Sequence, residues 1–306
     1  MHHKYIFSNL IGTFVFNEHF KPINRILFKN IGDYGDKGKF ETQLIAKYKN
    51  LKQPEGKELG RILEFFKNRD FFDEFYNKNL LLTKKRIKEA VTDDLLIIQT
   101  INNVIELDKI INTLTKRLRE WYEFYNPELS KRIYDNKKFS EIVLMEKKQK
   151  ESFGADLLRE NLEPILNLSK EIGSLYNLKD AQSKYLDGLM KKLCPNLIAI
   201  AGVSLGAKLL EHAGSLKKLM EMPASTVQLL GAEKALFRHI KNKKNLPPKY
   251  GILHEHPLIS QAKKREHGKI ARALADKISI AVKIDYFKGK FIGDKLKKEI
   301  EGKIKK

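Results

Sequence analysis

The sequence predicts an α+β protein with a small N-terminal α/β domain, a long antiparallel coiled coil and an all-α C-terminal domain. Three observations predict this architecture. Short β-branched and aromatic runs occur near the N-terminus, an uninterrupted helical pattern fills the middle, and the remainder is helical with lysine-rich connections. We therefore place the domains at residues 1–90, 91–192 and 193–306.

The N-terminal domain begins with a predicted strand meander. Residues 5–7, 12–16 and 23–28 are short runs rich in aromatic and β-branched side chains, and turn residues separate them. Apolar residues at helical spacing follow at 59–66. The segment therefore predicts a mixed α/β domain.

The middle domain is predicted to be a helical hairpin. Residues 93–122 contain no Gly or Pro and repeat apolar residues near a period of 3.6, and Asn126-Pro127 ends the pattern. A returning helix carries a second apolar stripe. The surplus apolar surface of such a coiled coil predicts a homodimer, and an intramolecular bundle is the alternative. The residues assigned to the dimer interface are Ile97, Ile101, Val104, Ile111, Leu118, Leu162, Ile165 and Ile172.

Charge is distributed unevenly along the chain. The formal net charge is +21, of which residues 191–306 carry +16, residues 1–90 carry +7 and residues 91–190 carry −2. A basic domain is expected of a nucleic-acid-binding protein, and a solvated lysine-rich surface is the alternative. No apolar run approaches the ~20 residues that cross a bilayer, and the single Cys194 suits a reducing cytosol. We therefore expect a cytoplasmic protein with no membrane partner.

The sequence offers no convincing catalytic centre. Residues 202–206 (GVSLG) fit the pattern of a hydrolase nucleophile elbow around Ser204, but the strand signals that an elbow needs are missing. His254 and His256 have the spacing of two metal ligands, and no third ligand is obvious. We expect a protein that is not an enzyme and that holds no metal and no cofactor, with a serine hydrolase as an alternative.

The main functional signal lies in residues 231–251. Lys234, Arg238 and Lys241 fall at i, i+4 and i+7 of a predicted helix, and a lysine-rich loop with two consecutive prolines follows. Such a row of cations beside a rigid basic loop suits a phosphate backbone. His239 and Tyr250 add rings that can stack on an unpaired base. The apolar positions expected to turn towards a core are Leu236, Phe237 and Ile240.

At these residues the sequence resembles the Nop domain family, and it is most similar to archaeal scaffold members of box C/D guide-RNA methylation particles. The similarity rests on GAEKALFRH and PPKYG within residues 231–251. Tyr250 stands where the family commonly has His, and residues 254–256 replace a more aromatic stretch. The other matching segments are 118–122, 127–129, 153–156, 195–207, 222–230 and 268–275.

The resemblance implies a non-catalytic scaffold for 2′-O-methylation of RNA. The N-terminal domain would bind the fibrillarin methyltransferase, which alone would hold S-adenosylmethionine, and the coiled coil would form a homodimer. The C-terminal Nop domain would bind a box C/D guide RNA with a kink-turn, together with the small ribosomal-type protein that binds kink-turns. A general basic coiled-coil RNA-binding protein is the alternative.

Residue by residue, the resemblance and the charge pattern define one set of contacts to RNA or to the kink-turn protein. The matching residues are Gly231, Ala232, Glu233, Lys234, Arg238, His239, Lys241, Lys243, Lys244, Lys249 and Tyr250. Charge alone adds Lys263, Lys264 and Arg265. An archaeal member would be cytoplasmic, whereas eukaryotic relatives are nucleolar.

Overall fold

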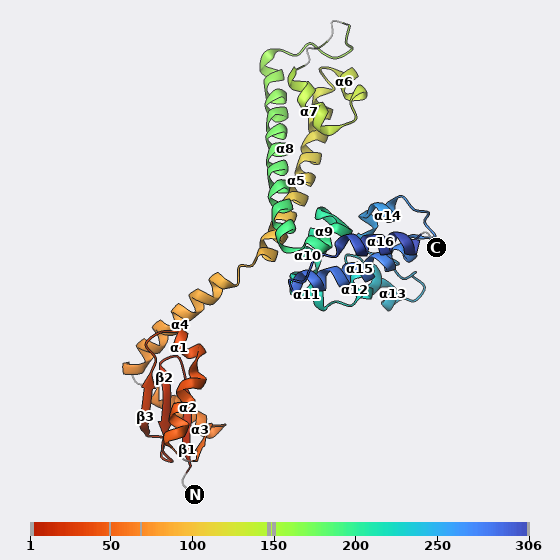
Figure 1. Ribbon diagram of the computed structural model, residues 1–306. Helices are drawn as coiled ribbons and strands as arrows, with labels where there is room; N and C mark the ends of the chain where they lie inside the picture. Colours follow the sequence, from red (N-terminus) through yellow and green to blue (C-terminus); the bar gives the residue numbers. More distant parts are fainter. Residues whose placement is uncertain (1–2, 49, 68, 146–147, 149–150, 305–306) are drawn as a thin grey trace. The chain divides into compact units, whose positions relative to one another are not determined.

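The computed structural model describes residues 3–48, 50–67, 69–145, 148 and 151–304. Two compact units make up the chain, Met1–Val91 and Thr92–Lys306 (Figure 1). Within the described residues, no helix is both long enough and apolar enough to cross a membrane.

The first unit contains a four-stranded sheet of order β3-β2-β1-β4. β1 (Lys4–Ser8), β2 (Gly12–Phe16) and β3 (Pro22–Leu27) form the antiparallel meander that the sequence predicts, and β4 (Leu51–Lys52) pairs with β1 in parallel. The helices of this unit are α1 (Gly32–Gly35), α2 (Lys37–Lys47), α3 (Lys57–Phe65) and α4 (Arg69–Glu89). The prediction of a small N-terminal α/β domain is confirmed.

The central strand β2 is buried along all five of its residues because helices cover both faces of the sheet. On one face Phe14 and Phe16 pack with Phe66, which directly follows α3. On the other face Val15 packs with Leu44 of α2. The first unit therefore has two small cores, one on each side of the sheet.

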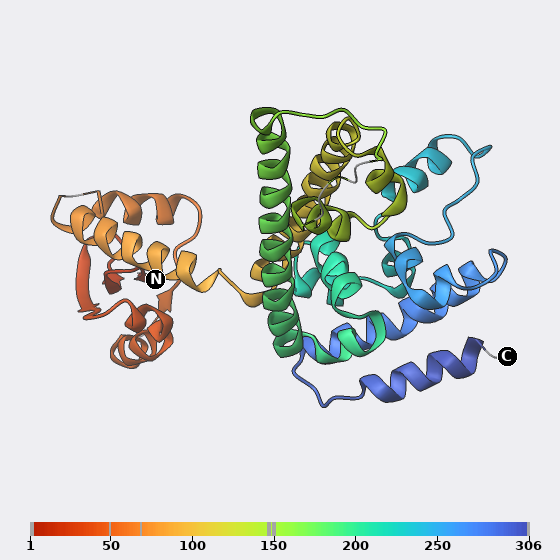
Figure 2. The same ribbon diagram turned by 90° about the horizontal axis from the view of Figure 1, so that it is seen from above.

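The second unit begins with the predicted hairpin of long helices. α5 (Asp93–Tyr122) and α8 (Arg159–Leu193) run antiparallel and side by side, as Figures 1 and 2 show. α6 (Pro127–Arg132) and α7 (Asn136–Met145) lie between them in the sequence. The Asn126 side chain accepts a hydrogen bond from Leu129 N and caps α6. Asn126-Pro127, which predicted the end of one helix, thus also starts the next.

Arg119 joins α5 to the connection between α6 and α7. Its guanidinium donates hydrogen bonds to the carbonyl oxygens of Ile133 (2.7 Å) and Tyr134 (3.0 Å) and to Asn136 Oδ1 (3.2 Å). It also lies 4.1 Å from the centroid of the Phe139 ring. Partial burial lowers the pKa of this guanidinium. These contacts fix the chain reversal at the end of the hairpin.

The structure corrects the assignment of the apolar stripe to a dimer interface. Six of the eight side chains are buried by their own chain, with exposed fractions of 0–1%: Ile97, Ile101, Ile111, Leu118, Ile165 and Ile172. Val104 and Leu162 are half-buried. Neighbours on α5, α7, α8 and the C-terminal helices cover the six buried positions. The apolar period identifies a face that is covered, but it does not identify the chain that covers it.

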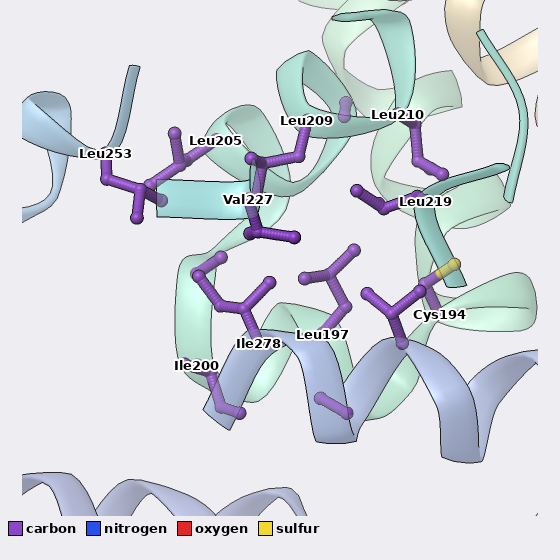
Figure 3. Packing of buried hydrophobic residues seen from close by; sticks show 14 of the residues in the cluster. Cys194, Leu197, Ile200, Leu205, Leu209, Leu210, Leu219, Val227, Leu253 and Ile278 are labelled. Atoms are coloured by element: carbon purple, nitrogen blue, oxygen red, sulfur yellow. The ribbon is translucent and has the colours of Figure 1, made fainter. Parts of the chain in front are cut away.

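The C-terminal helices share one core with the base of the hairpin. In Figure 3, Leu197 of α9, Val227 of α12 and Ile278 of α15 point into the same interior. Ile97 of α5 and Met190 of α8 belong to this core, so residues 92–306 form one compact unit. The elements are α9 (Pro195–Ala201), α10 (Val203–Ala213), α11 (Leu216–Glu221), α12 (Ala224–Leu229), α13 (Glu233–Lys241), η1 (Ile252–Glu255), α14 (Pro257–Ser260), α15 (His267–Tyr286) and α16 (Gly293–Ile304).

A buried carboxylate fixes the start of α9. Asp285, near the end of α15, accepts hydrogen bonds from Asn196 N (3.1 Å), Asn196 Nδ2 (2.8 Å) and Leu197 N (2.9 Å). Asn196 Oδ1 in turn accepts from Ile292 N, which precedes α16. Burial raises the pKa of Asp285, and the three donors oppose that shift. One side-chain pair therefore positions three helices of the C-terminal core.

Candidate nucleic-acid interface

The predicted basic helix is present and starts from a tight turn. Gly231 has a φ of +82°, and a Cβ at this position would lie 2.4 Å from Ile252 Cγ2, so the turn requires glycine. Glu233 Oε1 accepts a hydrogen bond from Gly231 N at 2.7 Å. The Glu233 carboxylate is thereby directed to the backbone, at the start of α13.

Three exposed cations follow this turn along α13. Lys234, Arg238 and Lys241 are all exposed, and none of them forms an ion pair with a described residue. Arg238 Nε donates only to the carbonyl oxygen of Lys234, at 3.3 Å. Their charges are therefore available to an external anion.

The apolar side of α13 is not covered as the sequence predicts. Phe237 is 67% exposed and Ile240 is 59% exposed, while Leu236 is half-buried. Leu246 in the following loop is 89% exposed. The prediction that all three helical positions turn towards a core is wrong for Phe237 and Ile240. Apolar and cationic side chains lie together on the exposed part of this helix.

The lysine loop that follows is held against α13. His239 Nδ1 lies 2.5 Å from the carbonyl oxygen of Asn245 and donates to it, and Asn245 Nδ2 donates to Arg238 O at 3.2 Å. Lys243 and Lys244 are exposed on this loop. One of the two rings predicted to stack on a base, that of His239, therefore has one nitrogen engaged in fixing the loop.

Tyr250 is likewise tied to the protein. Its hydroxyl donates to His267 Nδ1 at 3.0 Å, and His267 Nε2 donates to Ala262 O at 3.0 Å. The Tyr250 ring is half-buried and makes an edge contact with His267 at 5.5 Å between ring centroids. This relay connects the end of the lysine loop to the start of α15.

The base of the loop closes tightly on α12. Gly251 N donates to Gln228 O at 2.8 Å, and a Cβ on Gly251 would lie 1.8 Å from Leu230 O. Gln228 Nε2 donates to the carbonyl oxygen of Lys249 at 2.6 Å. The side chain of Lys249 is thus placed over the start of α15, where it lies against Gly268.

A basic groove results between α12, the lysine loop and α15, and we call it the α12–α15 groove. Two adjoining hollows of about 530 and 670 Å³ share Gln228, Lys269 and Arg272. The first also contains Pro248, Lys249, Arg265 and Gly268, and the second contains Ala224, Ser225, Ala273, Asp276 and Lys303. Asp276 pairs with Lys303 at 3.4 Å, and Glu266 pairs with Arg265 at 3.7 Å. The three remaining cations, Lys249, Lys269 and Arg272, dominate the groove.

The structure therefore divides the predicted contact residues into those that line the α12–α15 groove and those that lie outside it. Lys249 and Arg265 line the groove, whereas the α13 cations and Lys243 and Lys244 do not. Lys263 and Lys264 are exposed beside Arg265.

Two groove cations, Lys269 and Arg272, were missed by sequence reasoning. Their i, i+3 spacing at the start of a long helix was the available signal.

Neither alternative site of the sequence is formed. Ser204 is exposed on α10, which follows helix α9 instead of a strand, and Gly202 between them has a φ of +75°. His256 is buried; its Nε2 donates to Ile200 O at 2.9 Å and its Nδ1 accepts from Leu258 N at 3.2 Å. Both ring nitrogens are occupied by the backbone, so His256 caps α14 and does not pair with His254 as a metal ligand.

Comparison with known proteins places these features in one family. The family profile described as "Nop: snoRNA binding domain, fibrillarin" matches residues 104–156 and 145–306. A NOP5 family protein of Methanocaldococcus jannaschii is 37% identical over 316 residues, which cover 92% of this chain and 74% of the relative.

Eukaryotic relatives match a smaller part of the chain. Nucleolar protein 58 of Schizosaccharomyces pombe is 37% identical over 216 residues, 63% of this chain and 42% of its own. Nucleolar protein 56 of Mus musculus is 37% identical over 242 residues, 69% of this chain and 42% of its own. The chain thus spans less than half the length of these two relatives. A solved fibrillarin/Nop5p complex aligns over 98% of both chains at 22% identity with a TM-score of 0.48.

Proposed function

The chain belongs to the Nop family, and from this premise we propose that it is a non-catalytic scaffold of a box C/D guide-RNA ribonucleoprotein. In this role the second unit binds kink-turn RNA together with the small kink-turn-binding protein. The first unit carries a fibrillarin methyltransferase, which brings its own S-adenosylmethionine. The scaffold itself contributes proximity and orientation between the methyl donor and the RNA hydroxyl.

One observation carries the RNA-binding part of this proposal. Exposed cations without carboxylate partners among the described residues lie in the α12–α15 groove and along α13, on a domain with a large positive charge: Lys249, Lys269, Arg272, Lys234, Arg238 and Lys241. The helices and the hydrogen-bonded lysine loop fix the backbone that carries these cations before a ligand binds. This lowers the entropic cost of ordering the site on binding. Such a surface neutralises phosphates and fixes the register of an RNA.

Binding to kink-turn RNA, with and without the small kink-turn protein, tests the proposal. We expect the full chain to form a salt-sensitive complex that is tighter in the presence of that protein. A matched duplex of equal length without the kink-turn is the control. Equal affinity for both RNAs would instead support the alternative of a general basic RNA-binding protein.

We further propose that the hairpin forms a homodimer through its outer face. The apolar side chains that remain exposed there include Ile110 on α5 (47%) and Leu178 and Tyr185 on α8 (46% and 50%). Leu178 and Tyr185 are seven residues apart, so they share one side of the helix.

Point variants test the dimer more cleanly than removal of the hairpin, because Ile97, Ile101 and Met190 belong to the C-terminal core. Light scattering of the variant Ile110→Asp with Leu178→Asp should give a monomer. The variant Leu80→Asp, at an exposed leucine of α4, is the control. A dimer that persists in the hairpin variant would contradict this interface.

A further inference from the structure

A short aromatic and basic loop joins α15 to α16, and the kink-turn role does not involve it. Residues 287–291 read Phe-Lys-Gly-Lys-Phe, and Lys283 precedes them in the last turn of α15. We call residues 287–291 the α15–α16 loop. All five of its residues are exposed, and the exposed fractions of Phe287 and Phe291 are 71% and 54%. Figure 2 shows this connection at the periphery of the second unit.

The end of α15 fixes the backbone of the loop. Lys288 N donates to Asp285 O at 3.1 Å and Gly289 N donates to Ile284 O at 2.8 Å, and these are the two hydrogen bonds of a Schellman helix end. Lys288 takes the left-handed position of this motif with a φ of +54°. Glycine is usual there, so a lysine stands at a position that glycine would occupy with less strain.

The residues on either side of the loop are anchored, so the exposure of its rings does not come from loose packing. Tyr286 and Ile292 pack against the core of the second unit. The Phe287 ring makes an edge contact with Tyr286 at 5.1 Å between ring centroids. A Cβ on Gly293 would lie 3.0 Å from Phe291 Cε2, which places the Phe291 ring against the start of α16. Both rings are therefore positioned on the surface before a ligand binds.

The exposed charge of this segment is positive. Lys283, Lys288 and Lys290 are exposed, and none of them forms an ion pair with a described residue. The one acidic residue between 283 and 291 is Asp285, whose carboxylate is buried and accepts three hydrogen bonds from the start of α9. Asp294, the next carboxylate along the chain, lies in the first turn of α16, where the helix dipole stabilises it. The three lysines are therefore available to an anionic ligand.

Aromatic rings that alternate with lysines suit the unpaired part of a nucleic acid. Every base has a flat face that can stack on a phenylalanine ring, and the phosphates that link successive bases pair with lysines. A base inside a duplex has both faces covered by its neighbours, so stacking on a protein ring requires unpaired nucleotides. The composition of the loop therefore favours a single strand over a duplex.

A protein partner fits this composition less well. Charged residues are depleted in the buried centre of protein interfaces. Lys288 and Lys290 adjoin the two rings in the sequence, so a protein that covered the rings would also bury two ammonium groups, which is unfavourable unless it supplied a carboxylate for each. The phosphates of a single strand satisfy both groups beside the stacked bases.

We infer that the α15–α16 loop is a second nucleic-acid site and that it binds unpaired nucleotides of an RNA. Bases stack on the Phe287 and Phe291 rings, and the three lysines neutralise the phosphates between them. Phe287 and the groove residue Lys269 are separated by about 27 Å along α15, at 1.5 Å per residue. The two sites are therefore distinct and have a fixed separation. This inference goes beyond the kink-turn role and holds whether or not a kink-turn complex forms.

Binding of a single-stranded RNA to the full chain tests the stacking part of this inference. The probe is an unstructured, fluorescently labelled strand of about 12 nucleotides, within the usual range of such sites, and anisotropy measures its affinity. Phe287→Leu with Phe291→Leu keeps two apolar side chains and removes only the rings, so we expect it to weaken binding at least tenfold. Phe287→Tyr with Phe291→Tyr should bind as the wild type does. Phe124→Leu with Phe153→Leu is the matched control, at two phenylalanines of the second unit that are 67% and 96% exposed.

The variant Lys288→Gly separates binding from folding. Glycine suits a φ of +54°, so we expect the melting midpoint not to fall. The affinity for the single strand should nevertheless decrease, and the slope of log affinity against log salt concentration should become shallower by about 0.7, the share of one phosphate contact. An unchanged slope would contradict the contact between Lys288 and the RNA.

The outcomes separate this inference from the proposed function. Equal binding of the single strand by the wild type and the leucine variant would overturn the loop site and leave the scaffold role intact. No binding of kink-turn RNA by the wild-type chain would overturn the scaffold role and leave the loop site intact. A leucine variant that loses affinity for fibrillarin, and not for the single strand, would make the loop a protein contact and overturn the inference. Unchanged circular dichroism spectra and melting midpoints confirm that the variants are folded.

Discussion

The two hollowed surfaces of the molecule differ in composition. A cleft of about 580 Å³ beside α4 in the first unit is lined mainly by apolar side chains, such as Phe72 and Leu82, and by two cations, Lys67 and Arg86. The α12–α15 groove of the second unit contains five cations, three of them without a carboxylate partner among the described residues, and little that is aromatic. The first composition suits the face of another protein, and the second suits a phosphate backbone. The difference in composition is what the proposed scaffold requires, with one surface for a protein and one for an RNA.

Charge reversal in the α12–α15 groove should have the largest effect of the changes that separate the two surfaces, and it should act on RNA affinity alone. Lys269→Glu with Arg272→Glu places two carboxylates where we expect phosphates, and kink-turn RNA affinity should fall by about 100-fold at low salt. Fibrillarin affinity should not change. The control is Lys295→Glu with Lys298→Glu, which has the same i, i+3 spacing on exposed positions of α16 outside the groove. An equal loss of RNA affinity in the control variant would show that net charge, and not the position of the groove cations, causes the effect.

The salt dependence of binding should also distinguish the two surfaces, with a smaller change in affinity than charge reversal. Each phosphate contact contributes about −0.9 to the slope of log affinity against log salt concentration on a duplex. The variant Lys234→Ala with Arg238→Ala should bind kink-turn RNA more weakly, by about tenfold, and with a slope shallower by up to about 2. Binding of fibrillarin should show a much smaller slope in wild type and variant alike. A slope that the two substitutions leave unchanged would remove α13 from the RNA surface.

The parts of the fold that local chemistry determines were predictable from the sequence. The strand runs near the N-terminus pair as a meander, and the helix without Gly or Pro extends over Asp93–Tyr122. Both patterns depend on neighbouring residues, because strand alternation and helix period are properties of a short stretch. The same holds for the end of the helix near Asn126-Pro127.

The parts that depend on distant segments were not predictable. Ile97 and Ile165 are buried as their period indicates, but only packing shows that their own chain covers them. Phe237 has the same apolar character and is exposed, because no element lies over α13 at that position. The groove brings together Lys249 and Arg272 through the Gln228 contacts to the loop, which a linear motif does not contain.

The smallest expected effect concerns stability, and it should appear in the second unit. His256 is buried as the neutral ring that accepts from Leu258 N and donates to Ile200 O. Burial lowers its pKa, the hydrogen bond to Ile200 O opposes that shift, and the Lys297 charge adds to it. Because the pKa in the folded state is below the unfolded value of about 6.5, the stabilisation is complete above that pH. It decreases as the pH falls from there towards the lowered pKa.

Protonation of the folded ring would leave Leu258 N without its acceptor, so His256 of the unfolded chain takes up the proton first as the pH falls. We expect the folded state to lose about 1 kcal/mol of stability, or roughly 2–4 °C in melting midpoint, between pH 7.5 and 5.5. Trp121 is the only tryptophan and lies on α5, so its fluorescence reports unfolding of the second unit alone. His256→Gln should lower the midpoint at pH 7.5 and flatten its pH dependence, whereas His254→Gln, at an exposed position, should leave the dependence as in wild type. If the His256 variant retains the wild-type pH dependence, another group is responsible, and the neutral capping role of His256 does not contribute to stability in this range.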